Sequence, residues 1–365
     1  MSAGDSHANL LVQYEAMSVT EFTEQELDDL DDEVTLPLYV LLPLGLLGLY
    51  SLAFPWPVNS LPVYLAWLGF TTFIFFCYTS CFHETAHQTL SHSSRLSIIV
   101  GRILGTLMFT PYSVYRESHI RHHAYLNKPS DFELWPYSDP QSSLWFRRTF
   151  VWFDLLLGIF SGPIIYGRTF FHRDSPIRSP KIRRAVYVEY ALMIAFWAGV
   201  LTATAIYDQW FRLLTVWVLP HWLAGVMQTA RKLTEHLGMS SYDPLKGTRT
   251  IVANNWFTRL CTWMNFDIFV HGPHHRHPKV AHNLLQRKMQ DYSDATQEEF
   301  PVFANYRSAT WTMLPFLFRN PGVGMNAGAA SPEQEKKRRV ENFVADVSSE
   351  VLADADQQTH QTSAA

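Results

Sequence analysis

The sequence predicts an all-α integral membrane protein, with four transmembrane helices in two hairpins and a cytosolic helical cap that holds clustered histidines. The 365-residue chain is 47% hydrophobic, and its apolar residues are bunched into long uncharged stretches separated by polar, histidine-rich segments. The histidines gather in three short clusters beside those stretches. Length alone would also permit two soluble domains, but this grouping of apolar residues favours membrane helices with substantial cytosolic parts.

The first hairpin is expected near the N-terminal end of the chain. Residues 36–54 carry no charge and, at about 1.5 Å per residue, nearly cross a hydrocarbon core of about 30 Å. The sequence Pro55-Trp56-Pro57 breaks the helix, and Trp56 suits a membrane interface. Residues 61–81 form a second uncharged run, which returns the chain to its starting side. Upstream, residues 1–35 end in an acidic run and are expected to form a solvated tail.

Two further apolar segments are not expected to cross the membrane. Residues 96–115 contain Arg102 and end near Pro111, and a full crossing there would place the flanking histidine clusters on opposite sides. We therefore predict a half-buried or re-entrant segment. Residues 151–167 are short and are interrupted by glycine and proline, which favours an interfacial helix.

The second hairpin is expected at residues 186–206 and 209–229, two apolar runs joined by little more than Asp208. The basic stretch 168–184 before it is predicted to be cytoplasmic by the positive-inside rule. Four crossings then leave both termini and every histidine cluster on the cytoplasmic side of the membrane. The membrane domain is expected to cover residues 36–322. Beyond it, residues 323–365 are polar and are predicted to form a partly disordered tail.

The three histidine clusters have spacings that suit metal binding. Positions i, i+3 and i+4 of a helix share one face, so the imidazoles of each cluster are expected to converge on one point. The clusters are HETAH (His83 and His87), HIRHH (His119, His122 and His123) and HGPHH (His271, His274 and His275). His236 adds a ninth imidazole just after the last apolar run. Nine donors are too many for one metal ion and enough for two, and imidazole suits iron, zinc, copper or nickel.

These residues resemble the three histidine boxes of the membrane fatty acid desaturase superfamily, which also includes alkane hydroxylases, carotenoid hydroxylases and ketolases. The third box keeps the proline of the family pattern at Pro278. The segment Arg249-Thr250-Ile251 and Asn265 are similar to the family's approach to that box. The sequence TEHLGM around His236 is similar to the segment that supplies an extra histidine in alkane-hydroxylase-like members. The resemblance covers roughly residues 35–290.

The resemblance implies a centre of two non-haem iron ions, held by the nine histidines, that activates O2 against an unactivated C–H bond. It also implies a lipid or acyl-chain substrate in an apolar slot and a two-electron reductant. The simplest reading is acyl-lipid desaturation, while hydroxylation, ketolation and oxidative decarboxylation remain alternatives. Because no HPGG-type cytochrome b5 segment is found, we expect a separate donor of the ferredoxin or cytochrome b5 type. No nucleic-acid partner is expected.

Four carboxylates and one amide near the histidines are candidates for holding the second ring nitrogen of a metal ligand. The candidates for this outer role are Glu84, Asp131, Glu133, Glu235 and Asn265. His277 and His282 flank the third box but are not expected to be ligands. His221 lies within an apolar run and is expected to be satisfied or to line a pore. His7, His92, His172 and His360 are expected at the surface.

A histidine-rich metal transporter is the competing class of protein. Transport would place polar or ionisable ligands inside the apolar runs, along a path across the membrane. Here the clusters lie just outside those runs, which favours the enzyme.

Overall fold

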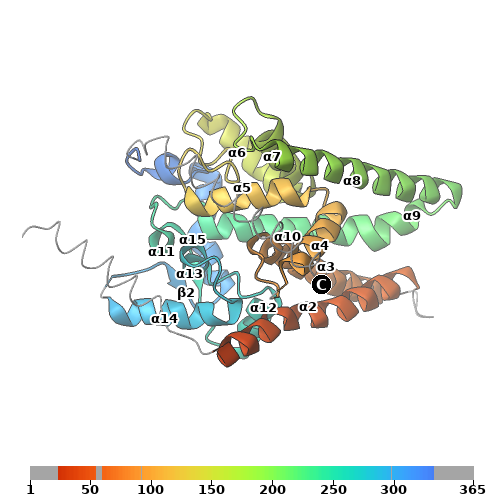
Figure 1. The fold of residues 1–365 in the computed structure, drawn as a ribbon, viewed down its shortest axis with the longest axis horizontal. Helices are drawn as coiled ribbons and strands as arrows, with labels where there is room; N and C mark the ends of the chain where they lie inside the picture. Colours follow the sequence, from red (N-terminus) through yellow and green to blue (C-terminus); the bar gives the residue numbers. More distant parts are fainter. Residues whose placement is uncertain (1–23, 55–59, 92, 297, 333–365) are drawn as a thin grey trace, which may run out of the picture.

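Helices form almost all of the regular structure. The structure, a computed structural model, describes residues 24–54, 60–91, 93–296 and 298–332 (Figure 1). Within these ranges, the only strands are β1 (Thr250–Ile251) and β2 (Val302–Phe303), which form one short parallel ladder. The expected helical fold is therefore observed, with this two-residue ladder as an addition.

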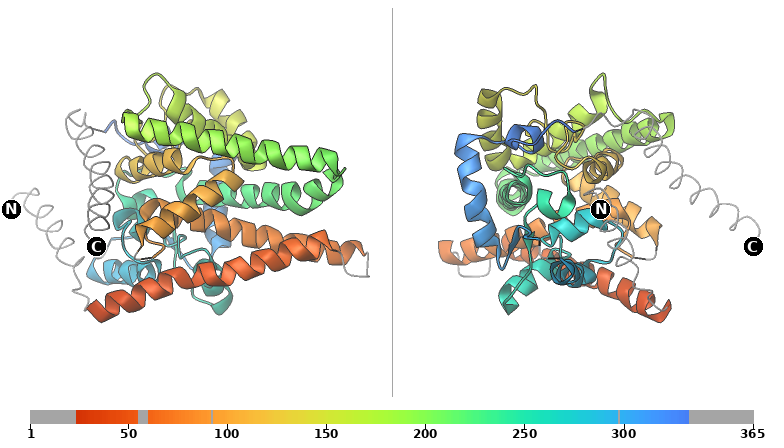
Figure 2. Two further views of the ribbon diagram at one scale, coloured as in Figure 1. Left: turned by 45° about the vertical axis from the view of Figure 1, so that its right-hand side comes forward. Right: turned by 90° about the vertical axis from the view of Figure 1, so that its left-hand side faces the viewer.

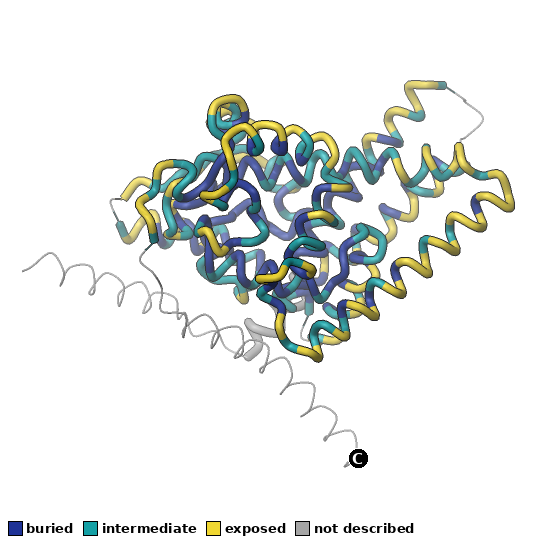
Figure 3. The backbone as a smooth tube through the Cα atoms, turned by 90° about the horizontal axis from the view of Figure 1, so that it is seen from above, coloured by how far each residue is buried: buried dark blue, intermediate teal, exposed yellow. Residues whose placement is uncertain are grey.

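Among the described residues, three helices are long and apolar enough to cross a membrane. They are α2 (Glu24–Ala53), of which Thr35–Ala53 is the apolar part, α3 (Leu61–His87) and α8 (Pro180–Ile206). Helix α2 begins at Glu24 instead of residue 36, so the end of the expected acidic tail is helical. The rest of that tail, residues 1–23, lies outside the described residues. Figure 3 shows that much of the surface of the projecting helices is exposed, and large apolar side chains such as Leu46 and Leu192 lie on it, as lipid-facing helices require.

The last apolar run forms a divided helix. It consists of α9 (Trp210–Leu213), the π-helical turn η1 (Leu214–Val218) and α10 (Leu219–His236). Pro220 in the first turn of α10 has no N–H to donate, which accounts for the widened turn before it. This divided helix is not among the three that qualify as spans. It nevertheless lies beside α3 along α10, beside α2 at η1 and beside α8 at α9, and its outer end projects together with α8 (Figure 2). Helix α10 also packs on several of the shorter helices described below.

The segment predicted to be re-entrant forms a sharply bent pair of helices. Helices α4 (Ser94–Leu107) and α5 (Tyr112–Ala124) meet at an angle of 105°. A Cβ atom on Gly105 would lie 2.4 Å from the carbonyl oxygen of Thr110, so this bend requires glycine there. The segment 151–167 falls in α6 (Leu144–Leu156) and α7 (Gly158–Phe171), which are separated at Leu157.

The remaining short helices surround the inner ends of the long helices. They are α11 (Pro244–Gly247), α12 (Trp256–Met264), α13 (His271–Arg276), η2 (His282–Leu284), α14 (Leu285–Ala295), α15 (Tyr306–Arg319) and η3 (Gly324–Ala327). Packing continues past residue 322, because Val323 is fully buried. Residues 333–365 of the expected tail lie outside the described residues.

Candidate metal centre

Nine histidine side chains from four helices meet at the inner ends of the long helices. They form two groups, and within each group the candidate ligand atoms lie within 4.8 Å of one another. The five-histidine group contains His83, His87, His119, His123 and His274, and the four-histidine group contains His122, His236, His271 and His275. The structure therefore brings together all nine residues that the sequence singled out. No other described histidine belongs to either group.

Each three-histidine box divides its side chains between the two groups, which corrects the expectation of a single point for each box. The pair His119 and His123, at i and i+4, stays in one group, while His122 joins the other. In the third box, His271 and His275 belong to the four-histidine group, while His274 belongs to the five-histidine group. Adjacent residues of an α-helix point about 100° apart, so a His-His pair reaches two neighbouring sites. The rings of His123 and His275, from different groups, are stacked with centroids 4.2 Å apart.

The spacing of the ring nitrogens tests whether a metal ion fits. The Nε2 atoms of His87 and His123 lie 3.0 and 3.1 Å from that of His119, and the Nε2 atoms of His236 and His275 lie 2.8 and 3.1 Å from that of His271. Two nitrogens bound at about 2.1 Å to one ion are about 3.0 Å apart at a right angle and about 3.4 Å apart at the tetrahedral angle. The observed spacings of 2.8–3.1 Å are therefore close enough for the nitrogens of each group to bind one common ion.

The second ring nitrogens of three histidines face carboxylates. The Nδ1 atom of His122 lies 2.8 Å from Asp131, that of His119 lies 3.0 Å from Glu133, and that of His83 lies 3.1 Å from Glu84. An Nδ1–H that donates to a carboxylate leaves Nε2 free and fixes the ring orientation. The Nε2 atoms of His83 and His274 are buried and have no hydrogen-bond partner. These unsatisfied nitrogens are what a ligand awaiting a metal ion would show.

The protonation states of the centre also suit metal binding. Burial, together with the charge of neighbouring imidazoles, lowers the pKa values of His271, His274 and His275 well below their ordinary range. Their rings are therefore neutral at pH 7, as a metal ligand must be. Although burial opposes ionisation, the His119 imidazole holds the pKa of Glu133 at about 2.

Two of the predicted outer residues have different roles from those expected. Both carboxylate oxygens of Glu235 accept hydrogen bonds from Arg231 at 3.1 Å, and Oε2 lies 3.6 Å from Nε2 of His271. Asn265 makes no hydrogen bond to any of the described histidines. Its Oδ1 accepts from the Ser80 hydroxyl (2.8 Å) and its Nδ2 donates to the Cys261 carbonyl (2.9 Å). Asn265 therefore holds the end of α12 against α3 at Ser80, which lies three residues before His83.

Two polar residues that hydrogen-bond to the surroundings of the histidine groups, Tyr166 and Asp267, were not predicted from the sequence. The Tyr166 hydroxyl donates to Glu133 (3.0 Å), and Asp267 accepts from both His282 (2.9 Å) and Arg259. No spacing pattern links Tyr166 to a carboxylate 33 positions earlier. By contrast, the ion pair of Arg231 and Glu235 could have been predicted from the sequence, because oppositely charged residues four positions apart on a helix are neighbours.

The histidines outside the boxes are placed largely as expected. Both His277 and the fully buried His282 lie outside the two groups. The side chain of His172 is 35% exposed beside Asp174. His7, His92 and His360 lie outside the described residues. His221 lines a cavity instead of belonging to a group.

An apolar cavity of about 540 Å³ leads to the centre. Its inner end is lined by His83, His122 and His236, and its outer part by side chains such as Leu42, Leu104 and Trp217. Helix α10 lines it from His221 to His236, a distance of about 22 Å at the helical rise. The cavity is thus long, with the nitrogen donors at one end.

The family model described as "Fatty acid desaturase" matches residues 35–306. The chain is similar to a chloroplastic omega-6 fatty acid desaturase of Spinacia oleracea, at 24% identity over 73% of this chain and 60% of the relative. It is also similar to a chloroplastic omega-3 fatty acid desaturase of Brassica napus, at 26% identity over 61% of this chain and 57% of the relative. An "sn-1 acyl-lipid omega-3 desaturase (ferredoxin)" of Synechocystis sp. is 26% identical over 61% of this chain and 64% of the relative.

The chain thus spans less than two thirds of the length of these relatives. The family model nevertheless covers most of the chain, from the first apolar helix to the start of α15, and it includes all nine grouped histidines. This protein therefore belongs to the fatty acid desaturase family.

Proposed function

We propose that this protein is an integral-membrane oxidoreductase with two non-haem iron ions, which uses O2 and external electrons to desaturate an acyl chain of a membrane lipid. One observation carries the proposal. Two adjacent groups of imidazole nitrogens lie at the inner end of a long apolar cavity. A polar, donor-rich end and an apolar body are what an enzyme needs to place one part of a hydrocarbon chain beside a metal centre.

The residues of the two groups fit iron. Neutral imidazole is a normal ligand of non-haem iron, and each group offers four or five nitrogens close enough together to bind one ion. Bound there, two iron ions would supply O2 activation strong enough to remove hydrogen from an unactivated C–H bond. The protein would hold the five- and four-nitrogen sites, orient the rings through Asp131, Glu133 and Glu84, and keep bulk water from the reacting carbons.

The dimensions of the cavity favour an alkyl chain as substrate. A cavity of about 540 Å³ whose wall follows helix α10 for about 22 Å is long enough to hold an extended alkyl chain. Because its outer walls come from α2, α4 and η1, which are apolar, a chain would enter from the lipid. Both acyl and other linear alkyl chains fit this shape, and the names of the relatives favour acyl chains and desaturation over hydroxylation, ketolation or decarboxylation.

The electron donor is proposed to be a separate protein of the ferredoxin type. Three of the relatives carry ferredoxin in their names. A cytochrome b5-type donor has no corresponding support.

The proposed topology has four crossings in two hairpins, with both termini and the histidines in the cytoplasm. The three apolar helices and the divided helix α9–η1–α10 support it. Single cysteines introduced at Ile120 and Asp208 into a cysteine-free variant would test it. A membrane-impermeant maleimide should label position 120 from the cytoplasmic side and position 208, in the turn between α8 and α9, from the opposite side. Labelling of both positions from one side would contradict the topology.

Metal analysis and product analysis together test the chemistry. The purified protein, with ferredoxin, its reductase, NADPH and an acyl lipid, should contain two irons per chain and yield an unsaturated acyl product that depends on O2. His275→Ala is the inactive control. A hydroxylated product would support the alternative oxidation instead. Exchangeable zinc without turnover would support a transporter, although the described donors are enclosed in one place and do not form a row along the spans.

A further inference from the structure

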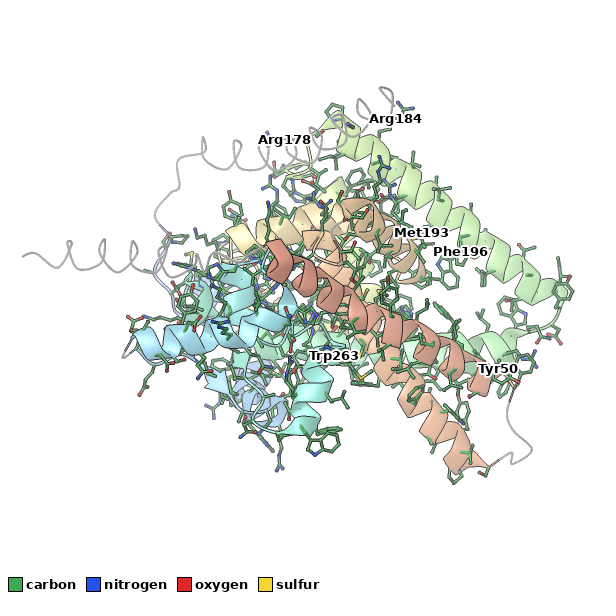
Figure 4. All side chains as sticks on the ribbon, turned by 60° about the horizontal axis from the view of Figure 1, so that its bottom comes forward. Tyr50, Arg178, Arg184, Met193, Phe196 and Trp263 are labelled. Atoms are coloured by element: carbon green, nitrogen blue, oxygen red, sulfur yellow. The ribbon has the colours of Figure 1, made fainter. Side chains whose placement is uncertain are left out.

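A second groove lies on the outer side of α4, between this helix, the start of α5 and α8. It encloses about 350 Å³ and is lined by Arg102, Lys181 and Arg184 together with Val188, Leu192 and Met193. Figure 4 shows Arg178 just before α8, Arg184 near the beginning of α8, and Met193 and Phe196 farther along the helix. The histidine boxes contribute no residue to this groove. The groove is therefore separate from the cavity that leads to the metal centre.

The groove carries an excess of positive charge. Glu189 is its one acidic residue, and this carboxylate is already engaged by Nε of Arg102 (3.0 Å) and by the backbone N–H and hydroxyl of Ser113 (2.8 Å each). Lys181 and Arg184 are exposed and form no ion pair within the described structure. Three cations against one carboxylate leave a net charge of +2 for a ligand to neutralise.

An adjoining hollow on the same helix extends the cationic surface. It encloses about 520 Å³ and includes Arg178, Arg183 and the shared residue Arg184. The guanidinium of Arg183 is turned inward, where it donates to the carbonyl of Ile177 (3.0 Å) and lies over the ring of Phe170. Arg178, like Lys181, is left exposed.

Along α8, the exposed side chains change from cationic near the beginning of the helix to apolar farther along. Lys181, Arg184, Val188 and Leu192 follow one another at spacings of three and four residues, which places them on one face of the helix. Val188 is 50% and Leu192 is 64% exposed. Leu192 lies eight residues beyond Arg184, which is about 12 Å along the helix axis. Because α8 qualifies as a span, the cations lie toward the membrane surface and the apolar residues lie toward the hydrocarbon core.

We propose that this groove binds one anionic phospholipid, with its phosphate on Lys181 and Arg184 and one acyl chain between α4 and α8. The +2 excess favours a headgroup with net negative charge over a zwitterionic one, because basic pockets between membrane helices bind anionic headgroups. The bound lipid would join α4 to α8 beside α5, the helix that carries the second histidine box. This site depends only on the membrane position of α8 and not on the chemistry proposed for the metal centre.

Native mass spectrometry of the full-length, delipidated protein tests this site with dioleoyl-phosphatidylglycerol and dioleoyl-phosphatidylcholine as probes. We expect retention of one phosphatidylglycerol under conditions that remove phosphatidylcholine. The double variant Lys181→Gln/Arg184→Gln should bind phosphatidylglycerol about 30-fold more weakly, since each near-surface cation contributes about fivefold. The matched control Arg173→Gln/Arg307→Gln, which removes two exposed cations outside the groove, should bind as the wild type does.

Two further measurements separate the headgroup from the chain. Glycerol 3-phosphate should not displace the lipid, and displacement at equal concentration would show a simple phosphate site. Ala185→Phe should fill the groove and abolish retention while every charge remains. Each variant is first checked for unchanged iron content and a monodisperse elution profile. Equal retention of the two lipids, or equal binding by the two double variants, would overturn the proposal.

Discussion

The Nε2 atoms of His236 and His271 lie 2.8 Å apart, although 35 residues separate them in the chain. His236 is the last residue of α10, and His271 is the first residue of α13. Arg249 fixes the end of α10, because its guanidinium donates to the carbonyls of Thr234 (3.0 Å) and Leu237 (2.8 Å). The buried arginine thus satisfies carbonyls that the helix end leaves open and holds His236 against the third box.

His236→Ala is predicted to remove most of one iron and nearly all O2-dependent turnover, because it takes one of four nitrogens from the four-histidine group. His282→Ala is the matched control, since His282 is equally buried but bonds to Asp267 outside both groups. Iron content and turnover of the two variants are the measurements. If both variants keep two irons and full activity, His236 is not a ligand.

His274→Ala and His275→Ala are predicted to damage different sites although the residues are adjacent. Loss of His274 leaves four nitrogens in the larger group, whereas loss of His275 leaves three in the smaller group. Loss of His275 should therefore weaken iron binding more. Mössbauer spectra of the two iron-57 variants should show different residual signals, with His277→Ala as the unaffected control. Identical spectra would show that the two residues serve one site.

Glu133→Gln is predicted to lower the stability of the metal-free protein in a manner that depends on pH. The pKa of Glu133 is about 2 in the folded protein and near 4.3 in an unfolded chain. A depressed carboxylate pKa stabilises the fold above the unfolded value, and this contribution is lost as the pH falls toward the folded value. Thermal unfolding should therefore separate wild type and variant fully at pH 7 and progressively less below about pH 4.3.

The control for this measurement is Glu298→Gln, which removes a carboxylate from an exposed pair with Lys246. Exposed pairs contribute little to stability, so this variant should unfold as the wild type does at every pH. A gap between Glu133→Gln and wild type that stays constant from pH 7 to pH 3 would contradict the assignment.

Trp217→Ala is predicted to lengthen the cavity at its outer end and to shift the preferred substrate toward longer acyl chains severalfold. The indole of Trp217 lines the cavity and contacts Phe75 and His221. Trp222 provides a control on the same helix, because its indole N–H donates to the Leu156 carbonyl (2.7 Å) and its side chain does not line the cavity. Product profiles from a mixture of chain lengths are the measurement. An unchanged profile for Trp217→Ala would place the end of the chain elsewhere.

The sequence predicted the helices that are defined by uncharged runs and the nine histidines that are defined by spacing. It did not predict the division of each box between two groups, because a face of a helix is a local property and the position of the second group depends on how α5, α10 and α13 pack. The start of α2 was missed for a similar reason. An acidic segment indicates solvent exposure but does not decide between coil and helix. Contacts such as Tyr166 with Glu133 arise only from tertiary packing.

The His-His pairs also have a consequence for how metal is acquired. His122 and His123 share one stretch of backbone but serve different groups, and so do His274 and His275. An ion that binds one histidine of a pair also restricts the backbone of the other histidine. A second ion then binds with a smaller loss of conformational entropy. Uptake would then be cooperative. Under scarce iron, the population would consist mainly of empty and doubly loaded molecules, with few that hold a single ion.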